Sequence, residues 1–183
     1  MTIRTKPFDR IRLERWRVHN SVLFLLTGSL FVNGAAAQEP VVGVASADHL
    51  FTSSDPQLNT NEQAAYHIVK DLLEANHWEL APKWLSTEYV QHNPNVTSGR
   101  EPVVKYFSER YKPTPIPAHM KTKVVAVVAQ GDLVIVVTPW QVTDPRNPSK
   151  TYTTSWFDMW RFKDGKAVEH WDNANIGPPP QTG

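Results

Sequence analysis

The sequence predicts an α+β fold, because helical patterns come first along the chain and β-hairpins follow. Apolar residues recur at helical spacing between residues 60 and 110, and runs of valine and aromatic residues between 120 and 172 are separated by glycine-containing turns. Helices followed by strands in this order are typical of the α+β class. A chain of 183 residues buries one core but seldom two, so one domain is expected.

The first 37 residues are expected to be a secretory signal peptide. Six basic residues lie in the first twenty positions, and the apolar run from Val22 to Val32 precedes the small-residue pattern Ala35-x-Ala37. The run is shorter than the ~20 residues of a spanning helix, although an uncleaved membrane anchor is the alternative. The sequence therefore predicts a secreted or periplasmic protein with no stable membrane span after cleavage.

Cleavage after Ala37 leaves thirteen basic and sixteen acidic residues, a net charge of −3. The basic residues that remain are scattered, so no cluster is available to bind nucleic acid, and this class of partner is excluded. The chain has no Cys, which excludes disulfides, Cys-based catalysis and Cys-ligated metal.

Residues 38–59 contain two prolines and no sustained period, so an extended lead-in is expected. A helix is predicted from Thr60 to Asn76, where apolar residues follow helical spacing and Thr60 with Gln63 fits a capping box.

Two shorter helices are predicted, from Trp78 to Leu85 and from about Glu101 to Arg110. Residues 60–176 form the predicted domain, and the proline-rich residues 177–183 are expected to leave it as an extended tail.

The predicted strands form two hairpins. Residues 120–129 and 133–140 are rich in valine, flank Gly131, and are both expected to be buried. A loop over 144–150 is expected to lead into a long strand, 151–162.

The last hairpin carries the candidate site residues Asp158, His170 and Asp172, and its register decides whether they meet. A two-residue loop at Asp164-Gly165 would place Asp158 on the sheet face opposite the other two. A three-residue loop would place Asp158 opposite His170 and Trp156 opposite Asp172, so that all three polar groups share one face. We expect the second register.

The same face would carry Trp156, Trp160 and Val168. Ionisable groups on an apolar face lose water, which favours general acid or base behaviour. The hairpin alone favours a structural interpretation instead, because Asp and His in strands are usually solvated or simply hydrogen-bonded.

A second motif, YVQHNPN at residues 89–95, favours function, because it adds Tyr89, Gln91 and His92 at a strand end that Asn-Pro stops. This string is followed by GREPVVKYFSERY, DLVIVV and DMWRFKDGKAVEHWD. In this order and spacing, residues 61–175 resemble the SnoaL-like polyketide cyclase family of the nuclear-transport-factor-2-like superfamily.

The resemblance implies a curved antiparallel sheet that forms a cone or half-barrel around a pocket, closed by the N-terminal helices, with no cofactor and no metal. Cyclases of this family catalyse an aldol condensation, and their acid/base residue carries over to Asp172. Asp158 departs from the family pattern, because the founding polyketide cyclase resembles this chain here but has His at the corresponding position.

We therefore expect cofactor-free acid/base chemistry next to a carbonyl group. The expected catalytic residues are Asp172, His170, Asp158 and His92, and the expected pocket residues are Trp156, Trp160, Tyr89 and Gln91. Aldol condensation or cyclisation, isomerisation and dehydration all fit.

Three further expectations concern what the site and the chain bind. A metal held by His92, Asp158, His170 and Asp172 is a weaker hypothesis, because the sequence has no compact ligand spacing. A secreted binding module for a small apolar ligand is the alternative to an enzyme. The only macromolecular partner expected is a second copy of the chain, in a homodimer through the outer face of the sheet.

Overall fold

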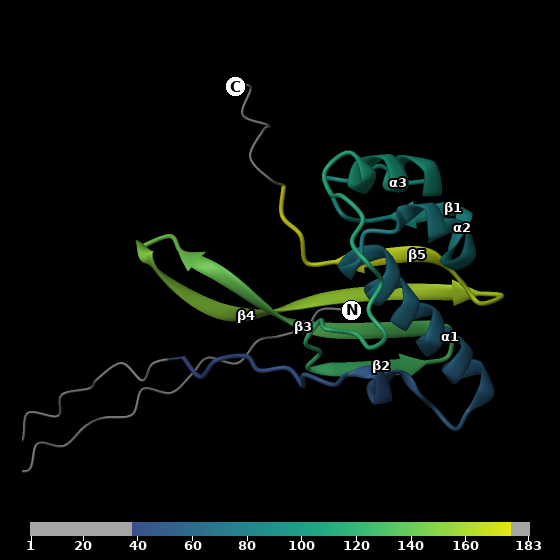
Figure 1. Cartoon of the computed structure of the whole chain (residues 1–183), viewed down its shortest axis with the longest axis horizontal. Coiled ribbons are helices and arrows are strands. Elements are labelled where there is room, and N and C mark those ends of the chain that lie inside the picture. Colours follow the sequence, from purple (N-terminus) through teal and green to yellow (C-terminus); the bar gives the residue numbers. More distant parts are fainter. Residues whose placement is uncertain (1–37, 177–183) are drawn as a thin grey trace, which may run out of the picture. The chain divides into compact units, whose positions relative to one another are not determined.

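The computed structural model describes residues 38–176 and is built around one sheet with the strand order β1-β5-β4-β3-β2 (Figure 1). The strands are β1 (Leu85–Gln91), β2 (Ala126–Gln130), β3 (Leu133–Asp144), β4 (Asn147–Lys163) and β5 (Lys166–Asp172). Their pairings are antiparallel except for β1 with β5, which is parallel. The sheet curves without closing into a barrel (Figure 1), so the predicted α+β fold with a curved sheet is confirmed.

The helices precede most of the strands, as predicted. They are a 3-10 helix at Asp48–Phe51, α1 (Pro56–His67), a π-helix at Ile68–Glu74 that continues α1, a 3-10 helix at Trp78–Leu80, α2 (Ala81–Trp84) and α3 (Arg100–Ser108). Among the described residues no helix has both the length and the apolar character needed to cross a membrane. The expected signal peptide (1–37) and proline-rich tail (177–183) lie outside the described residues.

Helix α1 begins four residues before the predicted start at Thr60. The Asp55 carboxylate accepts hydrogen bonds from the backbone N–H of Gln57 (2.8 Å) and Leu58 (3.0 Å), and Pro56 occupies the first helical position. The capping box at Thr60 was therefore wrong, because the hydroxyl of Thr60 instead donates to the Pro56 carbonyl (2.8 Å).

The core lies between α1, its π-helical extension and the inner face of the sheet. Phe51, Leu72, Val134 and Val136 are fully buried there, and each large apolar side chain removed from water stabilises the fold by roughly 2 kcal/mol. This packing fixes the helices over the sheet and leaves room for a cavity at one end.

The first hairpin differs from its prediction in two ways. Strand β2 begins at Ala126 rather than residue 120, and Val128 on its outer face is 54% exposed, so the prediction that both strands are buried was wrong. The expected loop over 144–150 is a short turn, because β3 and β4 stay paired as far as Asp144 and Asn147 and extend as a ribbon (Figure 1).

The register of the last hairpin also differs from the prediction. Asp164 (φ 52°) and Gly165 (φ 72°) form a two-residue loop between the paired residues Lys163 and Lys166. Positive φ at both positions is the geometry of a type I′ turn, which Asp-Gly favours.

A bulge in β5 then restores the expected face. Phe162 pairs with Ala167 but Arg161 pairs with Glu169, so Val168 is an extra residue. Beyond the bulge Asp158 lies opposite Asp172, two residues from the predicted pairing with His170. A shift of two preserves the face, and the three polar residues still lie on one side of the sheet.

We predict that Gly165→Ala lowers the free energy of unfolding by about 1–2 kcal/mol, because an L side chain is strained at positive φ. The added Cβ would meet only Thr60 Cγ2 at 3.7 Å, so crowding adds little. Urea denaturation measures the change. Gly165→Asn is the control, since Asn tolerates this conformation; equal losses in both variants would contradict the backbone explanation.

The outer face of the sheet carries exposed apolar residues, including Val90, Val128 and Phe157. Burial of this face is the expected basis of a homodimer. Light scattering at micromolar concentration should give twice the chain mass for the wild type and a lower mass for Phe157→Ser. A monomer in both samples would refute the dimer.

Candidate functional site

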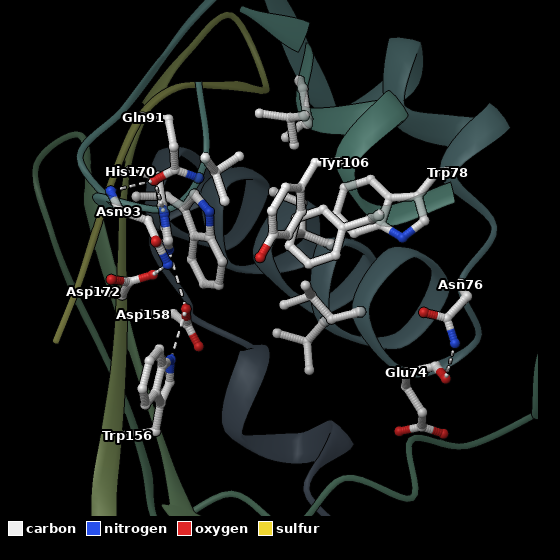
Figure 2. A pocket seen from close by; sticks show the side chains of 18 of the residues that line it. Glu74, Asn76, Trp78, Gln91, Asn93, Tyr106, Trp156, Asp158, His170 and Asp172 are labelled. Carbon is white, nitrogen blue, oxygen red and sulfur yellow. Dashed lines mark hydrogen bonds and ion pairs between the residues drawn. The ribbon is translucent and has the colours of Figure 1, made fainter. Parts of the chain in front are cut away.

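A cavity of about 580 Å³ lies between the inner face of the sheet and the helices. Most of its wall is apolar or aromatic, and Trp78 and Phe107 close one side as a stacked pair with ring centroids 4.2 Å apart. Figure 2 shows Gln91, Asn93, Asp158, His170 and Asp172 gathered on the side opposite Tyr106 and Trp78, whereas Glu74 and Asn76 lie on the side of Trp78. The site is therefore a largely apolar chamber, and its ionisable side chains from the sheet gather on one wall, referred to below as the polar wall.

Strands β4 and β5 supply the ionisable groups of that wall. Trp156, Asp158 and Trp160 alternate along β4, and His170 and Asp172 alternate along β5, so all five line the cavity. One ligand-type atom from each of Asp158, His170 and Asp172 lies within 4.8 Å of the others. The structure therefore brings together three of the four predicted catalytic residues.

His170 is buried and bonded through both ring nitrogens. Its Nδ1 lies 2.7 Å from Gln91 Oε1, and its Nε2 lies 3.1 Å from Asp158 Oδ1. The indole N–H of Trp156 donates to the same Asp158 oxygen at 3.2 Å. His170 and Asp158 thus form one hydrogen-bonded pair.

Asp172 is held separately. Its Oδ2 accepts from the side-chain amide of Asn93 at 2.6 Å, and its Oδ1 accepts from the backbone N–H of Ala174 at 3.0 Å. Both carboxylate oxygens therefore have donors, which fixes the side chain at the edge of the cavity.

Tyr89 and Trp160 form the inner part of the polar wall. The Trp160 indole N–H donates to the Tyr89 hydroxyl at 3.1 Å, and both side chains are buried. Burial raises the pKa of Tyr89 above its ordinary value, and the charges of Asp158 and Asp172 add to this effect. The phenol therefore stays protonated at neutral pH.

The prediction that His92 belongs to this site was wrong. Its Nε2 donates to Glu169 at 2.9 Å, and its ring stacks on Trp171 with centroids 5.1 Å apart, on the outer face. The hydrogen bond from His92 also lowers the pKa of Glu169. Side chains alternate along a strand, so His92 points away from the face to which Gln91 and Asn93 point.

Asn93 lines the cavity and bonds to Asp172, and the sequence analysis did not single it out. It follows Gln91 by two positions, and the same alternation that removes His92 from the site places Asn93 in it. That alternation was the signal available in the motif YVQHNPN. The predicted pocket residues Trp156, Trp160, Tyr89 and Gln91 all line the cavity.

The three ionisable residues offer the ligand types that zinc, manganese or iron accept. Those ligand atoms already have partners, however: Nε2 of His170 bonds to Asp158, and Asp172 accepts from Asn93. Metal binding would have to break the bond within the His170 and Asp158 pair. The absence of a metal cofactor stays a prediction.

Comparison with known proteins identifies a family. A family model described as the SnoaL-like domain matches residues 67–170. No curated protein sequence matches the chain.

Several solved structures are similar to this chain. They include a candidate polyketide cyclase from Acidithiobacillus ferrooxidans (14% identity, TM-score 0.47, covering 66% of this chain and 89% of that one). A candidate SnoaL-like polyketide cyclase from Jannaschia matches at 13% identity and TM-score 0.48, covering 67% of this chain and 91% of that one. An NTF2-like protein of unknown function from Burkholderia pseudomallei matches at 16% identity and TM-score 0.44, covering 63% of this chain and 91% of that one. Such distant matches carry no information about substrate.

We predict that Tyr89→Phe lowers the free energy of unfolding by about 1–3 kcal/mol, because the buried Trp160 N–H loses its acceptor. Chemical denaturation measures the loss. Tyr106→Phe is the matched control, since the Tyr106 hydroxyl has no hydrogen bond within the described part of the chain. If the two variants lose the same stability, the Trp160 hydrogen bond contributes nothing specific.

Proposed function

Because the chain belongs to the SnoaL-like domain family, we propose that it is a small-molecule enzyme that uses cofactor-free acid/base chemistry next to a carbonyl group. One observation carries the proposal: Asp158, His170 and Asp172 converge at the wall of a largely apolar cavity. Ionisable groups in such a setting act on a bound substrate with little competition from water.

In the proposed reaction, Asp172 removes a proton from the carbon next to a substrate carbonyl. The electron pair of the broken C–H bond forms a carbon–carbon double bond, and the carbonyl oxygen becomes enolate-like. The His170 and Asp158 pair donates a hydrogen bond or proton to that oxygen. Aldol condensation or cyclisation, isomerisation and dehydration share this first step.

The second candidate function is a binding module for a small apolar ligand. It is favoured by the hydrogen bonding of Asp172, whose two oxygens both have protein donors. A carboxylate whose two oxygens both accept from the protein has fewer lone pairs left to face a substrate. The shared first step separates the two candidates, because a binding module does not exchange carbon-bound protons.

We predict that the protein catalyses deuterium exchange at the α carbon of a ketone or β-dicarbonyl compound that binds in the cavity. Ligand-observed NMR in D₂O first identifies binders, and mass spectrometry then follows deuterium incorporation. Asp172→Asn should retain binding and lower the exchange rate by about 10²- to 10⁴-fold, the usual contribution of a general base.

His92→Gln is the matched control, because His92 contacts Glu169 on the outer face and the exchange rate should stay unchanged. Binding without exchange in the wild type would refute the enzyme and support the binding module. Exchange that survives Asp172→Asn would remove Asp172 from the reaction.

A further inference from the structure

Two side-chain amides at the end of β1 face the two proton carriers of the proposed reaction, which are Asp172 and the His170 and Asp158 pair. One amide presents its oxygen and the other its NH₂ group. Gln91 presents its carbonyl oxygen to His170, and Asn93 presents its NH₂ group to Asp172 (Figure 2). An amide can serve as donor or acceptor depending on how it is turned. What turns each amide therefore decides which form of its partner is stabilised.

The backbone fixes the orientation of Gln91. The backbone N–H of Asn93 donates to Gln91 Oε1 at 3.0 Å, and because a backbone N–H can only donate, the atom that it meets must be the oxygen. The same oxygen lies 2.7 Å from His170 Nδ1. It can only accept, so Nδ1 of His170 carries a proton.

The state of Nδ1 determines what Nε2 can do. With Nδ1 protonated, the contact of 3.1 Å between Nε2 and Asp158 Oδ1 holds one further proton, on either atom. The pair is then an imidazolium with a carboxylate or an imidazole with a carboxylic acid. In both forms it has a proton to give.

Asn93 is oriented by the same device in the opposite sense. Its Oδ1 accepts from the backbone N–H of Asn95 at 2.9 Å, which leaves Nδ2 to donate to Asp172 at 2.6 Å. The backbone N–H of Ala174 donates to the other oxygen of Asp172. Asp172 meets only donors, so both of its carboxylate oxygens are unprotonated acceptors.

We propose that Gln91 and Asn93 are positioning residues that assign opposite roles to the two proton carriers. Gln91 locks His170 with a proton on Nδ1, so that the His170 and Asp158 pair is the proton donor. Asn93 holds Asp172 as the acceptor. The tautomer lock stands on geometry alone, whereas its consequence for the reaction rests on the proposed function.

The lock is tested by NMR of ¹⁵N-labelled His side chains in the intact protein, with the His170 signals assigned by their loss in His170→Gln. The wild type should show a protonated Nδ1 at neutral pH. Gln91→Leu should leave Nδ1 unprotonated, so that the only ring proton is on Nε2, where the Asp158 carboxylate accepts it. Gln91→Glu, which keeps an acceptor, should restore protonated Nδ1.

Gln130→Leu is the matched control, because Gln130 is an exposed amide at the end of β2 and its loss should leave the His170 signals unchanged. An unprotonated Nδ1 in the wild type would overturn the lock. So would a His170 spectrum that Gln91→Leu leaves unaltered.

The exchange assay tests the consequence for the reaction. Asn93→Leu and Gln91→Leu should each lower the exchange rate by up to about 100-fold with little change in ligand affinity, as expected when a catalytic group is misplaced, and Gln91→Glu should recover part of the loss. Unchanged rates in both Leu variants would overturn the assignment of roles. If the wild type shows no exchange but the NMR results hold, the proposed function fails and the lock remains.

Discussion

The extra residue in β5 is the constraint on which the site depends. Side chains alternate strictly along paired strands, so a two-residue Asp164-Gly165 turn alone would send Asp158 and His170 to opposite faces. Val168 adds one residue to β5 and reverses the alternation from Glu169 onward. One backbone irregularity thus converts a hairpin with dispersed polar residues into one whose ionisable groups meet in the cavity.

The free-energy cost of burying those groups explains why each of them has a hydrogen-bond partner. Buried polar atoms are destabilising unless they are hydrogen-bonded, and the wall built by β4 and β5 alone cannot pair all of them. The end of β1, which lies beside β5, provides the partners of His170 Nδ1 and Asp172 Oδ2, because the chain turns there and frees backbone N–H groups. Those N–H groups orient the side-chain amides, so that Gln91 turns its oxygen to His170 and Asn93 turns its NH₂ group to Asp172.

The sequence predicted the class of fold, the order of the elements and the face of the final hairpin, because these depend on local patterns of apolar residues. The predicted register of the final hairpin was wrong. The predicted face was nevertheless right, because a two-residue turn with a bulge and a three-residue loop place the same residues on the inner face. The start of α1 was missed because Asp55-Pro56 is a cap signal outside the apolar period. His92 was predicted to lie in the site because His is a common catalytic residue. The alternation of side chains, which directs Tyr89, Gln91 and Asn93 into the cavity, directs His92 to the opposite face.

Exchanging the polarity of the two amides would exchange the roles of their partners. A carbonyl oxygen facing Asp172 would favour its protonated form, and an NH₂ group facing His170 Nδ1 would require that nitrogen to accept. The side chains of Gln and Asn permit either arrangement, but the backbone N–H groups of Asn93 and Asn95 permit only one. In the proposed reaction, the direction of proton transfer therefore follows from the path of the main chain after β1 as well as from the residue types at the ionisable positions.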